Sequence, residues 1–142
     1  MAEQPWNAAG VAKIRPRIGR WDVAENGEVS LVGTRCTSCG ESFFPERRVC
    51  GRCRSEATEE IRLKGPARLD SYTVVHQLPA GFAAPLAIGY AALGGDVLVL
   101  APIDAAPDVL RVGMPLALRV GVTRIDDDGE PMTSYRFAPT GA

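Results

Sequence analysis

The four cysteines of this 142-residue chain form two Cys-x-x-Cys pairs, and this spacing is the strongest chemical signal in the sequence. The pairs are Cys36 with Cys39 and Cys50 with Cys53. A gap of two residues lets both thiolates of a pair face one point, so two pairs supply four ligands at tetrahedral angles. This donor set is typical of a structural zinc site, which leaves no position for water. Gly40 and Gly51 are expected to form tight turns that aim backbone amides at the sulfurs.

Three other uses of these cysteines compete with structural zinc. Two disulfides need an oxidising compartment, and nothing in the sequence indicates secretion. A redox-active Cys-x-x-Cys pair is expected beside a βαβ pattern, and none flanks these pairs. Four thiolates also bind iron, which sequence alone does not distinguish from zinc. We therefore predict a four-thiolate metal site, with zinc ahead of iron as its ion.

Residue types that support catalysis are scarce elsewhere in the chain. His76 is the only histidine, which excludes a histidine-based metal site and a pair of catalytic histidines. Once the four cysteines bind metal, no thiol is left to act as a nucleophile. The sequence contains no Gly-x-Ser-x-Gly turn, and no Walker-type or Gly-x-Gly-x-x-Gly phosphate loop follows a strand. We predict that the chain does not catalyse a reaction on its own.

Composition and charge indicate a folded soluble protein, with 46% hydrophobic residues, 23% charged residues and a net charge of −1. Residues 35–68 carry eight Lys and Arg against five acids, whereas residues 69–142 carry four against eight. The basic segment is either the solvated surface of the metal module or a contact for a phosphate-bearing ligand or an acidic partner. No apolar run is long enough to span a bilayer, and no signal-peptide core is apparent. These features predict a cytoplasmic protein that does not act in a membrane.

The elements that must position the cysteines begin with an N-terminal arm. Residues 1–20 show no sustained period and are broken by Gly and Pro, so we expect an extended conformation. The large apolar side chains of this arm are expected to pack on the protein's own core or to dock on another subunit. They are Trp6, Ile14, Ile18 and Trp21. Asn26-Gly27 is a hairpin-turn dipeptide, and residues 28–34 then alternate as a strand that leads into the first cysteine pair. Between the pairs, Phe43 and Phe44 cannot both face a small core, so one is expected at the junction with the next domain or against a partner.

From residue 65 onward, short β-branched runs separated by turn residues predict a second, all-β domain. Its five expected strands span residues 67–76, 86–93, 97–103, 116–125 and 132–138. Five strands with a helical turn after the third predict a small closed barrel. An OB-fold is the first choice for this barrel, and a small sandwich is the alternative.

Two details of the barrel follow from its local sequence. Alternation along the first strand places Leu69 on the face opposite Tyr72 and His76. Asp104 is expected to cap the helical turn over residues 104–110.

Zinc knuckles and OB-folds both occur in proteins that bind single-stranded nucleic acid. Such proteins combine a basic groove with exposed aromatic side chains on which bases stack. Here the expected barrel is acidic, and aromatic residues make up only 6% of the chain. A single-stranded nucleic-acid-binding or general adaptor module is therefore the second hypothesis, and nucleic acid is not the expected partner.

Several motifs resemble one protein family when they are taken together. In the first half these are Leu31-Val32-Gly33-Thr34-Arg35-Cys36-x-x-Cys39-Gly40, Phe43-Phe44-Pro45-Glu46-Arg47 and Cys50-x-x-Cys53. In the second half they are Gly65-x-x-x-Leu69-x-Ser71-Tyr72-Thr73-Val74-Val75, Gly81-Phe82, Val112-Gly113-Met114-Pro115 and Tyr135-Arg136-Phe137-x-Pro139. Over roughly residues 31–139 the chain resembles the zinc-ribbon (rubredoxin-like)/OB-fold proteins associated with acyl-CoA metabolism. Glu46 departs from the usual Phe-Pro-Pro-Arg of that family.

The resemblance implies a mainly β architecture in three parts. These are an N-terminal arm and lead-in strand (residues 1–34), a rubredoxin-like zinc ribbon (35–64) and a five-stranded OB-fold barrel (65–142). It also implies a non-catalytic accessory subunit of a thiolase-like enzyme, such as a thiolase, aldolase or acyltransferase. Such subunits are needed for assembly and help to shape the acyl-CoA channel, while the partner supplies the reactive Cys and His.

The resemblance further implies that four residues lie near the CoA thioester bound by the complex. They are Arg47, Tyr72, His76 and Phe82. The alternative is that all four have structural roles. In that case Arg47 stabilises a knuckle, Tyr72 and His76 are ordinary strand residues, and Phe82 belongs to the core.

Overall fold

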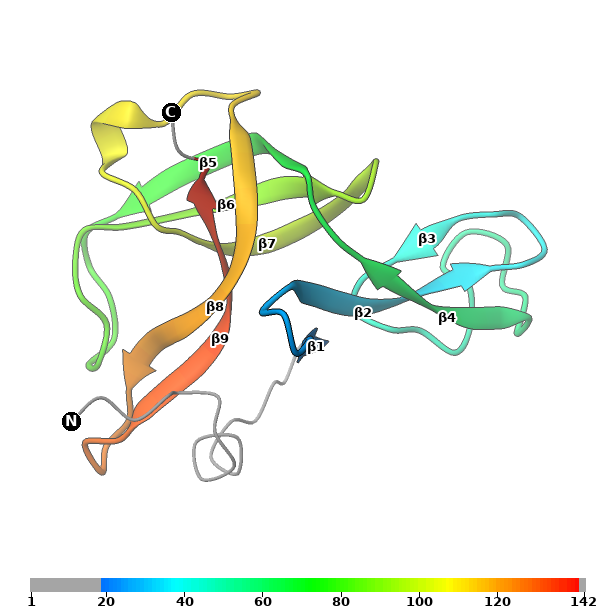
Figure 1. Ribbon diagram of the computed structural model, residues 1–142, viewed down its shortest axis with the longest axis horizontal. Helices are drawn as coiled ribbons and strands as arrows, with labels where there is room; N and C mark the ends of the chain where they lie inside the picture. The colour runs from blue at the N-terminus through cyan, green and yellow to red at the C-terminus, as the bar shows by residue number, and fades with distance from the viewer. Residues whose placement is uncertain (1–18, 141–142) are drawn as a thin grey trace.

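The computed structural model describes residues 19–140, which form a small sheet and a barrel joined side by side (Figure 1). The sheet contains β1 (Arg20–Val23), β2 (Val29–Cys36), β3 (Ser42–Phe43) and β4 (Thr58–Leu63). The barrel contains β5 (Ala67–Val75), β6 (Leu86–Leu93), β7 (Val97–Ile103), β8 (Pro115–Ile125) and β9 (Pro131–Pro139), with one 3-10 turn, η1 (Pro107–Val109). This confirms the mainly β prediction. In the described part of the chain, no helix is long and apolar enough to cross a membrane.

Strand β2 is the centre of the small sheet, which we call the ribbon module together with the two cysteine loops (residues 20–63). Strands β1 and β3 pair with successive halves of β2 on one edge, and β4 pairs with the opposite edge. The Asn26-Gly27 turn joins β1 to β2 as predicted. Gly27 has a φ of 88°, and the amide of Glu28 donates to the Asn26 side chain at 3.0 Å.

The barrel closes in the strand order β5-β6-β7-β9-β8, which confirms the closed barrel over the sandwich. All neighbouring strands are antiparallel except β7 and β9, which meet in a parallel pair at Ile103 and Phe137. Strand β8 returns to β5 through Leu116 and Ala67. The five predicted barrel strands match the observed ones to within one residue at each end, whereas the strand predicted over residues 28–34 is observed as β2, Val29–Cys36.

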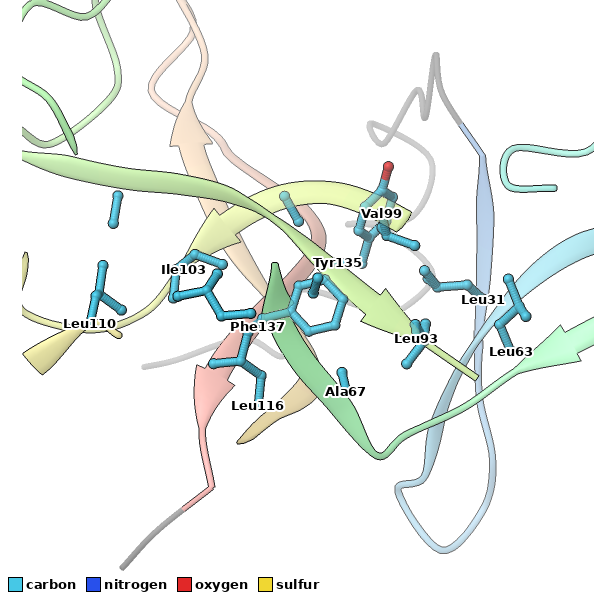
Figure 2. Packing of buried hydrophobic residues seen from close by; sticks show 14 residues of the cluster. Leu31, Leu63, Ala67, Leu93, Val99, Ile103, Leu110, Leu116, Tyr135 and Phe137 are labelled. Carbon is cyan, nitrogen blue, oxygen red and sulfur yellow. The ribbon is translucent and has the colours of Figure 1, made fainter. Parts of the chain in front are cut away.

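The ribbon module and the barrel share one hydrophobic core. Leu31 of β2 and Leu63 of β4 are buried and lie beside barrel residues such as Leu93 (Figure 2). This joint core buries apolar surface of both parts at once, so the hydrophobic effect holds them together.

An aromatic cluster on Tyr135 completes the junction. The rings of Phe44 and Trp21 both meet the Tyr135 ring edge-on. The distance between ring centroids is 5.4 Å for Phe44 and 6.1 Å for Trp21. The prediction that one of the adjacent Phe residues lies at the junction is therefore confirmed. Trp21 packs on the protein's own core, whereas Trp6, Ile14 and Ile18 lie outside the described residues.

Two local predictions are wrong. A bulge in β5 between Leu69 and Ser71 shifts the register, so strict alternation fails. Leu69 and Tyr72 therefore lie on the same face, because both contact Gly89 of β6. A Cβ added at Gly89 would come within 2.4 Å of the Ser71 carbonyl oxygen.

Asp104 does not cap the helical turn. The N-cap of η1 is Ala106, and Asp104 instead forms an ion pair with Arg136 of β9.

Candidate metal centre

The four cysteine sulfurs gather in one cluster, with all four Sγ atoms within 4.8 Å of one another. Between the knuckles, Sγ of Cys36 lies 3.5 Å from Sγ of Cys53, and Sγ of Cys39 lies 3.6 Å from Sγ of Cys50. A tetrahedral ion with metal–sulfur bonds of about 2.3 Å places its ligands about 3.8 Å apart. The cluster therefore fits one metal ion, and its four thiolates are the donor set of a closed structural site.

The two cysteine loops are equivalent knuckles. In each, the amide four residues after the first cysteine donates to that cysteine's carbonyl, at 2.8 Å for Gly40 and 3.0 Å for Arg54. These are also the residues with left-handed backbone, with φ of 83° and 64°. Gly40 thus forms the predicted turn. Gly51 also lies in the predicted turn of the second knuckle, although Arg54 rather than a glycine takes the left-handed position there.

Backbone amides point at the sulfur of the first cysteine in each knuckle. The Cys39 amide donates to Cys36 at 3.5 Å, and the Arg52 and Cys53 amides donate to Cys50 at 3.3 and 3.4 Å. The Cys39 amide is the largest influence on the Cys36 thiol and helps to lower its pKa to about 6. Desolvation alone would raise the pKa of Cys50, but the Cys53 and Arg52 amides outweigh it and lower that pKa. Both thiols are thus prepared to bind as thiolates, the form that ligates metal.

The surroundings fix the two knuckles relative to each other. Cys36 and Cys50 are fully buried, whereas Cys53 is exposed. The hydroxyl groups of Ser38 and Ser55, one from each knuckle, form a hydrogen bond at 3.0 Å. These contacts join the knuckles on the protein side, and a bound ion would join them through the sulfurs.

Arg47 supports the second knuckle and remains exposed. Its guanidinium lies over the Phe43 ring at 5.2 Å, and its amide donates to the Thr34 hydroxyl at 3.0 Å. A Cβ added to Gly51 would stand 3.2 Å from the Arg47 guanidinium, so this glycine leaves room for the stacked side chain. These are the contacts expected of an arginine that stabilises a knuckle, which is one of the two roles predicted for Arg47.

The structure does not bring Arg47 together with the other three residues assigned to acyl-CoA. Arg47 lines a groove of about 400 Å³ on the ribbon module, whereas Phe82 lines a separate groove of about 460 Å³ on the barrel. Tyr72 lines neither groove and donates a hydrogen bond from its hydroxyl to the Leu110 carbonyl at 3.4 Å. His76 is exposed immediately after β5 and also lies outside both grooves.

Glu46, which departs from the family motif, has a clear role in the ribbon module. Both of its carboxylate oxygens accept hydrogen bonds from Arg20, at 2.7 and 2.9 Å. Arg20 also donates to Glu60 of β4 at 3.0 Å. The hydrogen bond and charge of Arg20 lower the pKa of Glu46. Glu46 therefore ties its loop to β1 and, through Arg20, to β4 by charge.

Sequence reasoning missed the groove on the barrel. Its polar residues are Asp104, Thr123 and Arg136, which are far apart in the sequence. The available signal was Arg136 itself, a charged residue between two aromatic residues in a strand. The sequence predicts a helix cap for its partner Asp104 and therefore does not connect Asp104 with Arg136.

A sheet that carries a four-cysteine cluster and shares its core with a closed five-stranded barrel defines the class of zinc-ribbon/OB-fold proteins. Residues 27–59 match the family described as "ChsH2, rubredoxin-like zinc ribbon domain", and residues 60–121 match "ChsH2, C-terminal OB-fold domain". The chain belongs to this ChsH2 (DUF35) family of zinc-ribbon and OB-fold proteins.

Named relatives match most of the chain. A DUF35 domain-containing scaffold protein of Methanocaldococcus jannaschii is 34% identical over 77% of this chain and 81% of its own length. The benzoylsuccinyl-CoA thiolase subunit BbsA of Thauera aromatica is 33% identical over 75% of this chain and 74% of its own length. Among solved structures, a chain of the Ltp2-ChsH2(DUF35) aldolase superposes with a TM-score of 0.63 at 26% identity, covering 78% of this chain and 84% of that one.

Proposed function

We propose that this chain is a non-catalytic, zinc-binding accessory subunit of a cytoplasmic thiolase-like enzyme that acts on acyl-CoA thioesters. The observation that carries the proposal is that the similarity to BbsA, a thiolase subunit, runs through both the ribbon module and the barrel. The likeness to a chain of an aldolase complex supports the same conclusion. The term thiolase-like covers three classes of partner enzyme: a thiolase, an aldolase or an acyltransferase.

The placement of reactive groups supports a non-catalytic role. All four thiols of the chain belong to one cluster, where a metal would make them unavailable as nucleophiles. His76 stands exposed at the end of β5, away from both described grooves. In our proposal the partner therefore supplies the catalytic Cys and His, and this chain positions or encloses the substrate.

We assign different tasks to the two modules. The predicted zinc-ribbon domain (residues 35–64), which contains both cysteine loops of the ribbon module, contributes to assembly. It holds zinc rather than iron through Cys36, Cys39, Cys50 and Cys53. The barrel (residues 65–142) forms part of the wall of the acyl-CoA channel.

Within this division, the four residues near acyl-CoA contact different parts of the thioester. Exposed Arg47 suits the phosphate groups of CoA, since guanidinium binds phosphate well. Tyr72, His76 and Phe82 belong to the barrel side of the channel. These contacts require a partner, because the chain alone does not gather the four side chains.

The test is a mild-salt affinity purification of the tagged chain from its source cell, followed by mass spectrometry and an acyl-CoA activity assay. We expect a thiolase-like protein at a stoichiometric ratio, whose activity or stability falls when this chain is omitted. An Arg47→Ala variant should still assemble but raise the KM for the CoA thioester. Recovery of nucleic acid in place of such an enzyme, or of no partner at all, would contradict the proposal and favour the nucleic-acid or adaptor module.

A further inference from the structure

The groove of about 460 Å³ on the barrel is formed entirely by this one chain. It lies where β6 begins, where β7 ends and where the pairing of β8 with β9 shifts its register between Val122 and Arg124. Phe82, Leu86 and Val122 are among its apolar lining residues, and Asp104, Thr123 and Arg136 are its polar ones. Most of its lining residues are apolar, and a few placed polar groups among apolar residues are typical of a small-molecule site.

The loop that forms one wall of the groove is fixed to the barrel. The amide of Ile125 donates to the Gly81 carbonyl at 2.9 Å, and Gly81 has a φ of 97°. A Cβ at Gly81 would stand 2.0 Å from the Ile125 carbonyl oxygen, so only glycine permits this approach. The guanidinium of Arg124 then covers the Phe82 ring at 5.5 Å. The groove is therefore a built feature of the barrel.

Two buried polar atoms of groove residues have no hydrogen-bond partner among the described residues: Nε of Arg136 and Oγ1 of Thr123. The other two nitrogens of Arg136 are engaged, Nη1 with the Val122 carbonyl and Nη2 with Asp104 at 2.9 Å. A buried polar group without a partner is costly, and native proteins rarely retain one without a reason. Both atoms belong to groove-lining residues and are closed to solvent, so a ligand in the groove must reach an N–H donor and a hydroxyl that lie just beneath its surface.

We propose that this groove binds a neutral carbonyl compound that carries a small apolar group. The carbonyl oxygen accepts hydrogen bonds from Arg136 Nε and the Thr123 hydroxyl, and the apolar group packs on Phe82, Leu86 and Val122. A neutral ligand fits better than a carboxylate, because Asp104 already balances the charge of Arg136. Thioesters and amides both present such a carbonyl, and if the proposed function holds, an acyl thioester is its source.

The test is a ¹H–¹⁵N NMR titration of the metal-loaded full chain with S-methyl hexanethioate and, separately, with N-methylhexanamide, which differ only at the atom next to the carbonyl. We expect shifts confined to the groove, at residues 82–87, 103–105 and 122–123 and at the Arg136 Nε–H signal. Tighter binding of the thioester would identify an acyl thioester as the source, and tighter binding of the amide would identify an amide. Hexanoate should bind about tenfold more weakly than the thioester, since its charge must be desolvated while Arg136 stays paired with Asp104.

Thr123→Val removes the hydroxyl while keeping the shape of the side chain. It should weaken binding about fivefold, the effect of one hydrogen bond. The melting temperature should stay unchanged or rise, because the folded state loses an unpaired buried hydroxyl. Thr73→Val, on an exposed part of β5 outside the groove, is the matched control and should leave binding unchanged.

Three results would overturn the inference: no shift at the groove with either neutral probe, equal affinity of Thr123→Val and the unmodified chain, or hexanoate binding as tightly as the thioester. This test uses the chain alone, so it fails independently of the proposed function. A chain that recovers a thiolase-like partner but binds neither probe would refute only the groove assignment.

Discussion

The ribbon module and the barrel are stabilised in different ways. The barrel is built around large buried side chains such as Phe137, Leu69 and Ile103. The ribbon module instead relies on a thiol cluster and on exposed ion pairs such as Arg20 with Glu46. A sheet this small cannot bury enough apolar surface by itself, and metal binding supplies the missing folding energy. The ribbon module therefore depends on its ion and on the barrel, whereas the barrel depends mainly on its own core.

Metal removal should show the largest difference between the two parts. Cys36→Ser, or treatment with a strong chelator, removes the binding energy of the ion, which is on the order of 10 kcal/mol in small zinc domains. We expect NMR signals of the ribbon module to lose their dispersion first. The barrel should melt at a lower temperature but remain folded, because it loses Leu31 and Leu63 from its core.

A serine substitution at an exposed position outside the cluster, Thr37→Ser, is a control that should keep both metal and melting curve. If Cys36→Ser also kept its metal and its melting curve, the assignment of the ligands would be wrong.

Truncation of Tyr135 should have the next largest effect, because it removes the aromatic contact that joins the two parts. Tyr135→Ala should reduce the free energy of unfolding by about 3–5 kcal/mol, as for other large buried aromatic residues. Denaturant unfolding provides the measurement. Tyr90→Ala, at a position that is 42% exposed, should change stability by less than about 1 kcal/mol. A double-mutant cycle with Phe44→Ala should give a non-zero coupling, and strict additivity would mean that the junction is not a unit.

Gly89→Ala tests the barrel without touching the ribbon. An added Cβ would meet the Ser71 carbonyl oxygen at 2.4 Å, and this backbone atom cannot easily move away. We expect a loss of about 1–3 kcal/mol in unfolding free energy, with metal content unchanged. Gly51→Ala is the matched ribbon variant, because its new Cβ is crowded only by the flexible end of Arg47, at 3.2 Å, and makes an ordinary contact with the Phe43 ring at 3.5 Å. A larger effect of Gly51→Ala than of Gly89→Ala would reverse the expected order.

Glu46→Gln should have the smallest effect, below about 1 kcal/mol, because its ion pair with Arg20 is exposed. Arg20 lowers the pKa of Glu46, so the folded state binds this proton less readily than the unfolded state. The stabilisation is therefore complete above the ordinary carboxyl pKa of about 4.3 and is lost as the pH falls through the lowered value. Unfolding curves of the two proteins should converge in acid. The role assigned to Glu46 would be wrong if the difference in stability between Glu46→Gln and the unmodified chain persisted at low pH. It would also be wrong if Glu56→Gln had an equal effect.

The sequence predicted those features that depend on local spacing. Cysteine spacing predicted the cluster, and β-branched runs between turn residues predicted the barrel strands. The adjacency of Phe43 and Phe44 predicted that one of them leaves the small module. The bulge in β5 and the left-handed conformation of Arg54 were missed, because both depend on how distant segments pair. The shared core was missed for the same reason, since nothing in the β2 sequence says that Leu31 meets the barrel. The barrel groove required register and tertiary contacts as well, because its polar residues come from three separate segments.

The single parallel pair between β7 and β9 has a consequence for the solubility of the chain. Among the described residues, Ile103 is the only β7 residue that pairs with β9, so most of β7 forms a sheet edge on that side. This edge carries Leu98 and Leu100, which are 46% and 48% exposed. An apolar edge strand is a template on which further strands of other molecules can add, and Pro102 limits such growth at one end only. Concentrated samples of the chain should therefore aggregate through β7, and a charged substitution such as Leu98→Lys should keep them monomeric.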